Sequence, residues 1–174
     1  MTVAIRPVRA SDIPAITSIY AHAVEHGTAS FELHPPDTRE MSRRMELLLA
    51  DDYPYFVAEA DGVICGYAYA GPYRTRPAYR WTLEDSVYIA PGAQRQGHGR
   101  ALLQAVIEAS EARNFRQMIA VIGDSVRQKA SIGLHEALGF RRAGLLESVG
   151  HKHGRWLDSL LMQRILGHAA TTPP

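Results

Sequence analysis

Residues 87–100 read VYIAPGAQRQGHGR, and this stretch joins an apolar strand to an amphipathic helix through a loop that contains glycines. A helix that begins after such a loop presents free backbone N–H groups, and its dipole adds partial positive charge, so the junction attracts anions. Gly97 and Gly99 let an anion approach the backbone without meeting a Cβ atom. Arg95 and Arg100 can hold phosphate oxygens by charge-assisted hydrogen bonds. The stretch therefore predicts a phosphate-binding loop, with a solvent-exposed turn as the alternative.

Two other nucleotide-binding loops are disfavoured by the same residues. A dinucleotide-binding loop requires a third glycine in a parallel strand–helix–strand unit near the N-terminus. A Walker loop requires Gly-Lys-Ser or Gly-Lys-Thr, and this chain has neither.

Hydrophobic periodicity outward from the loop predicts the remaining elements. The order strand, two helices, three strands, helix, strand, helix, two strands predicts an α/β (α+β) fold, in which about four helices flank a mixed, mainly antiparallel central sheet. Asp61-Gly62 is typical of a hairpin turn. Residues 151–154 are expected to form the turn between the last two strands. The second helix is expected to place Met41, Met45, Leu48 and Leu49 on one face. We expect strands at residues 2–8, 55–58, 63–70, 81–89, 117–122, 140–149 and 156–163, and helices that begin at residues 11–14 and 35–37 and extend over 100–113 and 130–138.

The composition is typical of a single-domain cytoplasmic protein. The chain has 174 residues, of which 46% are hydrophobic, and we expect one domain over residues 1–166 and a disordered tail at 167–174. The formal net charge of +1 favours neither nucleic acid nor a membrane as a partner, and no stretch is typical of a membrane span or a secretory signal. Cys65 is the single cysteine, which favours the reducing cytoplasm. His151 and His153 have no third ligand at useful spacing, so we expect no metal.

Several stretches resemble one enzyme family. Residues 94–99, QRQGHG, resemble the Gln/Arg-x-x-Gly-x-Gly/Ala signature of the GNAT acetyltransferase superfamily. The resemblance extends from about residue 5 to residue 163, nearly the whole chain. The stretches similar to its phosphinothricin N-acetyltransferase branch are TASFE at 28–32, YRWTLEDSVY at 79–88, ASIGLHEALGF at 130–140 and GHKHGRWLD at 150–158.

The resemblance implies the GNAT fold, in which the middle strands of the sheet splay apart, acetyl-CoA as the acetyl donor, and a homodimer. Members of this branch acetylate the α-amino group of phosphinothricin, methionine sulfoximine, methionine sulfone and, in some cases, ordinary L-amino acids. Two alternatives stay open. The first is an acetyltransferase that acts on another small amine or on a protein N-terminus. The second is a GNAT domain that binds CoA without catalysis.

The resemblance also implies which residues hold acetyl-CoA. The pantetheine arm pairs with the exposed edge of the strand before the loop, through the backbone of Val87, Tyr88 and Ile89. Gln128 stands where the family often has an asparagine that contacts the coenzyme arm, and Ser131 keeps its match. The pyrophosphate is expected on the loop residues Gln94, Arg95, Gln96, Gly97, His98, Gly99 and Arg100.

Acetyl transfer requires a base, because an amino acid amine is mostly protonated at neutral pH. The motif match assigns this role to Glu84, and the alternative is a structural ion pair with Arg80 or Arg74. His135 stands where many GNAT enzymes have a tyrosine that protonates the departing CoA thiolate, and imidazole donates protons near neutral pH. The alternative for His135 is a residue that only packs and contacts CoA.

The acid group of the substrate requires a cation, and a guanidinium binds carboxylate or phosphinate through paired hydrogen bonds. Arg80 is the first candidate and Arg74 the second. Phe31 and Tyr73 are expected to line the substrate pocket, and Thr82 to offer backbone groups to the carboxylate.

Overall fold

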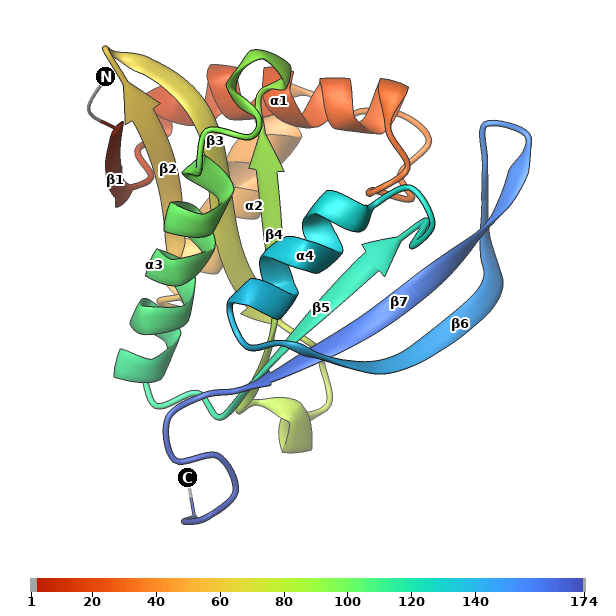
Figure 1. Cartoon of the computed structure of the whole chain (residues 1–174). Coiled ribbons are helices and arrows are strands. Elements are labelled where there is room, and N and C mark those ends of the chain that lie inside the picture. The colour runs from red at the N-terminus through yellow and green to blue at the C-terminus, as the bar shows by residue number, and fades with distance from the viewer. Residues whose placement is uncertain (1–2, 174) are drawn as a thin grey trace.

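Residues 3–173 are described by the computed structural model, and they form seven β-strands and four α-helices (Figure 1). Thr2, which we expected in the first strand, lies outside the described residues. Residues 167–173 follow the last strand as turns and irregular chain, and disorder there stays a prediction. The elements occur in the predicted order, β1 (Val3–Pro7), α1 (Ile13–His26), α2 (Thr38–Ala50), β2 (Tyr55–Ala60), β3 (Val63–Pro72), β4 (Thr82–Ile89), α3 (His98–Ala112), β5 (Gln117–Gly123), α4 (Lys129–Ala137), β6 (Arg141–Lys152) and β7 (Arg155–Ile165).

The strands form one sheet in the order β1-β2-β3-β4-β5-β7-β6, in which the central β4–β5 pair is parallel and the other pairs are antiparallel. The parallel pairing joins residues 82–85 to residues 117–120 and then stops. Residues 86–89 of β4 stay paired with β3, while residues 121–123 of β5 stay paired with β7. The two middle strands therefore separate after Asp85, which confirms the predicted splay (Figure 1).

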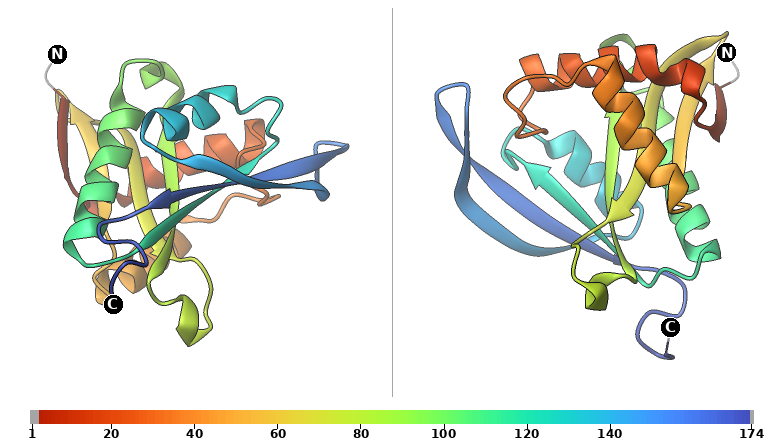
Figure 2. Two further views of the ribbon diagram at one scale, coloured as in Figure 1. Left: turned by 60° about the horizontal axis from the view of Figure 1, so that its bottom comes forward. Right: turned by 180° about the vertical axis from the view of Figure 1, so that it is seen from behind.

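Both faces of the sheet are covered by helices (Figure 2). On one face α1 and α2 enclose a buried cluster that includes Ile16 and Met45. On the other face α3 and α4 enclose a second cluster that includes Leu102 and Ile132. Each helix buries residues three or four positions apart, as an amphipathic helix packed on a sheet requires. Leu49 is the exception to the prediction for α2, because it lies beyond the buried stripe and is exposed.

The hairpins follow from local turn chemistry. Asp61-Gly62 joins β2 to β3 with positive φ at both residues (50° and 80°), the conformation that a tight two-residue hairpin requires. The last hairpin is tighter than the turn predicted at residues 151–154. Because β6 extends through Lys152, only His153 and Gly154 remain in the turn. The β6–β7 hairpin projects beyond the rest of the sheet (Figures 1 and 2).

Candidate active site

The splay between β4 and β5 opens a cavity of about 60 Å³ in the middle of the sheet. Within the described residues, positions 86–89 of β4 have no strand partner on the β5 side. Backbone N–H and C=O groups on that edge are therefore free to pair with a bound molecule. The cavity is lined by Ala29, Asp85, Ser86, Val87, Tyr88, Ala120, Val121, Ile122, Ser131 and His135.

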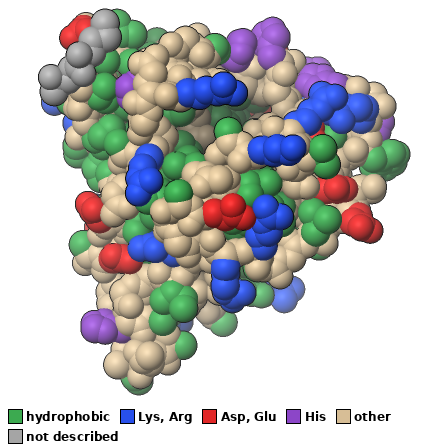
Figure 3. Space-filling view, in the orientation of Figure 1, with side chains coloured by type: hydrophobic (Ala, Val, Ile, Leu, Met, Phe, Trp, Pro, Cys, Tyr) green, Lys and Arg blue, Asp and Glu red, His purple; other side chains and the backbone are tan. Residues whose placement is uncertain are grey.

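The N-terminus of α3 is open to an anion. Gly97 occupies the N-cap position in the left-handed region (φ 87°), and no side chain of the described residues caps the helix there. An L-residue rarely adopts this backbone conformation, so glycine is favoured. The side chains of Gln94, Arg95, Gln96 and Arg100 are exposed around this turn. Figure 3 shows several basic side chains spread over this face of the molecule, with acidic side chains among them.

Two residues of the predicted loop have structural contacts. The side chain of His98 is buried, so its ring points into the protein. A Cβ atom on Gly99 would lie 3.4 Å from Leu134 and 3.7 Å from Ile89, so Gly99 lets α3 pack closely against α4 and β4. A contribution of His98 to phosphate binding would therefore come from its backbone N–H.

Glu84 faces the α2 side of the sheet, together with Ser86. Burial raises the pKa of Glu84, the charge of Asp85 adds to this rise, and Arg74 opposes it. The carboxylate forms no ion pair with Arg74, Arg80 or any other residue between 3 and 173. The structural ion pair considered as the alternative role of Glu84 is therefore not formed. The hollow that it faces, of about 410 Å³, is lined by Arg44, Leu47, Leu48, Asp51, Tyr53, Tyr69, Gly71, Pro72, Glu84 and Ser86.

His135 lies on α4, and both of its ring nitrogens are engaged. Nδ1 lies 2.7 Å from the carbonyl oxygen of Ser131, and Nε2 lies 3.0 Å from Oδ2 of Asp85. The ring is buried and meets Phe140 edge-on. Burial lowers the pKa of His135, but the hydrogen bond and charge of Asp85 outweigh burial and raise this pKa above its ordinary value of 6.5. His135 therefore reaches the splay cavity as half of a buried acid–base pair.

Three other residues were predicted to contact the coenzyme or the substrate, and the structure places them at three different sites. Ser131 lines the splay cavity, as expected. Gln128 lies at the N-terminus of α4 in a separate hollow that includes His153, so the structure does not bring it into the splay cavity. The carbonyl oxygen of Thr82 accepts a hydrogen bond from the backbone N–H of Tyr73 (3.2 Å), so one of its backbone groups is already in use.

The predicted cations lie near the loop that joins β3 to β4. Arg74 lies 5.0 Å from the centre of the Tyr73 ring, and its charge acts on Glu84. Arg80 is exposed and lies 5.4 Å from the centre of the Trp81 ring. Neither arginine is among the residues that line the hollow beside the base. Because the charge of Arg74 acts on the pKa of Glu84, Arg74 is favoured over Arg80 as the cation near the base.

Phe31 lies in the loop after α1, against two glycines. A Cβ atom on Gly123 or on Gly150 would overlap the Phe31 ring. The same loop contributes Ala29 to the wall of the splay cavity. The ring, 38% exposed, therefore lies at the end of β5 where the splay opens.

The β6–β7 hairpin holds the loop after α1 in place through hydrogen bonds. Lys152 is buried and donates a hydrogen bond from Nζ to the carbonyl oxygen of Ser30 (2.8 Å). Thr28 donates to Oδ2 of Asp124 (2.8 Å), and the same oxygen pairs with Arg155 (3.2 Å). Desolvation lowers the pKa of Lys152. These contacts give Lys152 a structural role at the loop that contains Phe31.

The structure adds two side chains that the sequence reading missed. Arg44 reaches the hollow beside the base from α2, where Glu32 and Glu40 hold it in ion pairs (2.6 and 2.8 Å). Because α2 has the pattern of an ordinary charged surface helix, no sequence signal connected Arg44 to the site. Asp85 directly follows Glu84, and strand alternation was the signal that placed it on the opposite face.

The part of the chain that the structure describes contains neither a cluster of potential metal ligands nor a helix that could span a membrane. No three His, Cys, Asp or Glu side chains between residues 3 and 173 are grouped to hold a metal ion. No helix in this range is long and apolar enough to cross a membrane. His151 packs against the ring of Trp156 (5.1 Å), and Nε2 of His153 lies 3.2 Å from the carbonyl oxygen of Gly27.

Known proteins share this fold and sequence. The profile of the acetyltransferase (GNAT) family matches residues 16–140. A phosphinothricin N-acetyltransferase from Alcaligenes faecalis is 57% identical over 170 residues, which cover 98% of this chain and 86% of the relative. An L-methionine sulfoximine/L-methionine sulfone acetyltransferase from Salmonella typhimurium is 41% identical over 161 residues, 92% of this chain and 93% of the relative. The crystal structure of a GNAT superfamily phosphinothricin acetyltransferase from Sinorhizobium meliloti in complex with AcCoA has a TM-score of 0.97 and 46% identity, and the match covers 100% of this chain and 94% of that one.

The fold, the splay and these similarities define the class as an acetyl-CoA-dependent N-acetyltransferase. The chain belongs to the acetyltransferase (GNAT) family. The described residues fit the coenzyme at two points: the α3 N-terminus is open to a pyrophosphate, and the edge at residues 86–89 is open to an extended arm. The predicted fold, enzyme class and acetyl donor are thereby confirmed.

Proposed function

We propose that this enzyme transfers the acetyl group of acetyl-CoA to the α-amino group of phosphinothricin and of related analogues such as methionine sulfoximine and methionine sulfone. The relatives from Alcaligenes faecalis and Salmonella typhimurium support this substrate class. In this chain the proposal depends on one observation. Glu84 is a half-buried carboxylate without an ion pair among residues 3–173, and it faces a hollow on the side of the sheet opposite Asp85 and His135.

Glu84 acts as the base. The amine enters from the α2 side as an ammonium ion, and Glu84 accepts its proton directly or through water, so that the free amine attacks the thioester. A carboxylate with a raised pKa is a stronger proton acceptor near neutral pH than an ordinary one. Backbone N–H groups on the open edge at residues 86–89 stabilise the negative charge that develops on the thioester oxygen.

His135 supplies the proton that the departing CoA thiolate takes up. The contact between Nε2 and Asp85 supports this role because it favours the protonated ring. Transfer requires the Nε2–H group to exchange its hydrogen-bond acceptor, Oδ2 of Asp85, for the sulfur of the thiolate. The alternative role, a contact to the coenzyme alone, predicts that His135→Asn raises the KM for acetyl-CoA and leaves kcat unchanged.

Arg74 binds the acid group of the substrate, and Arg80 is the second candidate. Support for Arg74 comes from its charge acting on Glu84, since the amine and the acid group of an amino acid are only a few bonds apart. Charge reversal, Arg74→Glu, should mainly raise the KM for carboxylate substrates. An unchanged KM would remove Arg74 from the substrate site.

A thiol-release assay over a panel of amines tests the function. We expect the highest kcat/KM for phosphinothricin, methionine sulfoximine or methionine sulfone, and lower values for ordinary L-amino acids. A polyamine or a peptide N-terminus as the best substrate would support the alternative acetyltransferases. Absence of thiol release with every amine would support the CoA-binding domain without catalysis.

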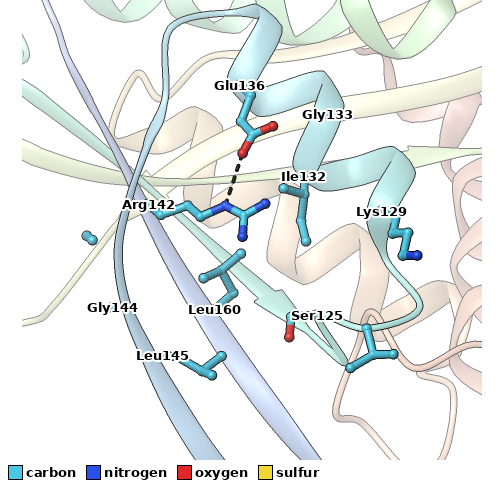
Figure 4. Close-up of a pocket in the computed structure, with 11 residues that line it drawn as sticks. Ser125, Lys129, Ile132, Gly133, Glu136, Arg142, Gly144, Leu145 and Leu160 are labelled. Atoms are coloured by element: carbon cyan, nitrogen blue, oxygen red, sulfur yellow. Dashed lines mark hydrogen bonds and ion pairs between the residues drawn. The ribbon is translucent and has the colours of Figure 1, made fainter.

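The homodimer is proposed to form at the groove between α4 and β6, of about 830 Å³ (Figure 4). Val126, Ile132, Leu145 and Leu160 contribute its apolar wall, and both Val126 and Leu145 are exposed. We expect a dimer by light scattering, and Leu145→Glu should give a monomer. Val63→Glu changes an exposed valine at the start of β3, which does not line this groove, and should leave the dimer intact. A monomeric wild-type enzyme would contradict this proposal.

The enzyme is proposed to act in the cytoplasm, where Cys65 stays reduced. Cell fractionation followed by the thiol-release assay tests this location. Activity confined to a secreted or periplasmic fraction would contradict it.

A further inference from the structure

The Asp85–His135 pair is buried at the point where β4 and β5 separate. The two side chains are 2% and 5% exposed, and both residues line the splay cavity. Within residues 3–173, Oδ1 of Asp85 has no hydrogen-bond partner, and Oδ2 bonds to the imidazole. His135 is therefore the one protein group that satisfies this carboxylate in the described part of the chain.

The hydrogen bonds of His135 show where its protons lie. A carbonyl oxygen only accepts hydrogen bonds, so Nδ1, which lies 2.7 Å from the Ser131 carbonyl oxygen, carries a proton. Nε2 lies 3.0 Å from a carboxylate oxygen, and two facing lone pairs at that distance would repel each other. A second proton therefore lies between Nε2 and Oδ2. The raised pKa of His135 favours the imidazolium–carboxylate form of this pair.

Among the described residues that line the splay cavity, Tyr88 is the one other titratable group, and its ring packs away from the pair, against Tyr20 and Tyr67. Ala120 and Ile122 of β5 line the same cavity and are apolar. Phe140 presents the edge of its ring to His135, with the ring centres 4.9 Å apart. The nearest further carboxylate along β4 is Glu84, which faces the hollow on the α2 side.

We propose that Asp85 is a positioning residue, which holds His135 as an imidazolium with its Nε2 proton ready for the departing CoA thiolate. This inference rests on the proposed function and deepens it. In the proton transfer, the N–H bond at Nε2 breaks and an S–H bond forms on CoA. The immediate products of this step are the neutral thiol and a neutral imidazole whose Nε2 lone pair faces the Asp85 carboxylate. Because that arrangement is repulsive, Nε2 takes up a proton from solvent before the next turnover, and Asp85 remains a carboxylate throughout.

Asp85 also acts on the base. Its negative charge raises the pKa of Glu84 on the other side of the strand. Loss of that charge should therefore lower two pKa values together, the one of Glu84 and the one of His135. A residue with a purely structural role would not move both limbs of a pH–rate profile in the same direction.

The decisive measurement is a pH titration of the ring nitrogens of His135 by NMR in the intact enzyme without substrate. We expect both nitrogens to be protonated at neutral pH. In Asp85→Asn burial acts without the carboxylate, so the ring should be neutral at neutral pH with its proton on Nδ1. Asp61→Asn removes the same charge from the β2–β3 turn and should leave His135 unchanged. A neutral His135 in the wild-type enzyme at neutral pH overturns the proposal, whether or not Asp85→Asn folds.

Kinetics provide the second readout. Asp85→Asn should lower kcat about 10- to 100-fold at neutral pH, with little change in the KM for acetyl-CoA. In a His135→Asn background the same substitution should cause no further loss from the acid step, once the shift of the Glu84 limb is measured in each profile. An unchanged kcat in Asp85→Asn overturns the proposal. If no amine is acetylated by the wild-type enzyme, the proposed function fails, while the NMR titration still decides the protonation of His135.

Discussion

Gly150→Ala should displace Phe31 and weaken binding of the amine. A Cβ atom on Gly150 would lie 2.6 Å from Cδ2 and 2.8 Å from Cζ of the Phe31 ring, and closer still to Cε2. Ordinary carbon–carbon contacts begin near 3.5 Å, so the ring must retreat by about 1 Å. The ring is already 38% exposed, and it has room to turn toward solvent.

The magnitude follows from the contacts that the ring loses. Complete burial of a phenylalanine contributes about 1.5–3 kcal/mol, and Phe31 is only partly buried, so we expect a loss of roughly 1–2 kcal/mol. For a chain of 174 residues this corresponds to a fall in Tm of about 2–8 °C. If Phe31 lines the amine pocket, a displacement of this size should lower kcat/KM for the amine by roughly 10- to 100-fold. The KM for acetyl-CoA should stay unchanged.

Two controls separate this steric effect from a general effect of alanine. Gly92 lies outside this contact, and a Cβ atom there would meet no atom within 4 Å, so Gly92→Ala should change neither Tm nor kcat/KM for the amine. In a Phe31→Ala background the steric conflict is gone, so Gly150→Ala should become nearly neutral in both measurements. If Gly150→Ala lowers Tm equally in both backgrounds, or leaves the amine KM unchanged in the native one, the assignment of Phe31 to the pocket is refuted.

Three further predictions concern the base, the loop and the stability of the domain. Glu84→Gln should lower kcat about 10²- to 10⁴-fold at neutral pH, with partial recovery at alkaline pH where the amine loses its own proton; the acidic limb of the wild-type profile should lie above the ordinary carboxyl value of 4.5, because burial raises the pKa of Glu84. A wild-type profile in the variant would contradict the base role. Gly97→Ala should cost about 1–2 kcal/mol through its positive φ and raise the KM for acetyl-CoA, whereas Gly92→Ala, with open space and no positive φ, should do neither. Asp12→Asn weakens the pair with Arg6 (2.8 Å), which keeps its second ion pair with Glu59 (2.6 Å), and should cost about 1.5–3 kcal/mol by denaturant unfolding. The hydrogen bond from Arg6 holds the pKa of Asp12 below its ordinary value of 3.8. The stabilisation that the pair contributes is therefore complete above pH 3.8 and is lost as the pH falls through the lower pKa of the folded state. Equal acid sensitivity of wild type and variant would refute this account.

Most of the fold could be predicted from the sequence, because its signals are local. Alternating apolar residues gave the strands, and Asp61-Gly62 gave a hairpin that needs two positive φ angles. Strand ends were less certain, because pairing with a neighbour decides them. β6 extends to Lys152 through its pairing with Arg155 of β7, and no property of the Lys152 side chain predicts this. The splay came from the family resemblance, since no local pattern states where two parallel strands separate.

In the candidate site too, features within one stretch of sequence could be predicted, and contacts between distant stretches could not. The predicted phosphate loop is continuous in sequence, and the structure places Gly97 at the open start of a helix, which begins at His98 rather than at residue 100. The contacts that join distant segments could not be predicted. Asp85 and His135 are 50 positions apart, and Lys152 and Ser30 are 122 positions apart. Such contacts depend on the register of the sheet and on helix packing, which a single sequence does not contain.

In the proposed mechanism, two consecutive residues on opposite faces of β4 set the pH range of catalysis. That mechanism requires Glu84 without its proton and His135 with its proton, so activity is expected between their two pKa values. The charge of Asp85 raises both pKa values, and the active range therefore moves toward alkaline pH without closing. An α-amine loses its own proton more readily in that range, so less of the substrate has to be deprotonated by the enzyme. In Asp85→Asn the range should move toward acid, where the amine is more fully protonated. The same substitution should therefore be more harmful for an amine of high pKa than for one of low pKa, and equal losses for both would contradict this coupling.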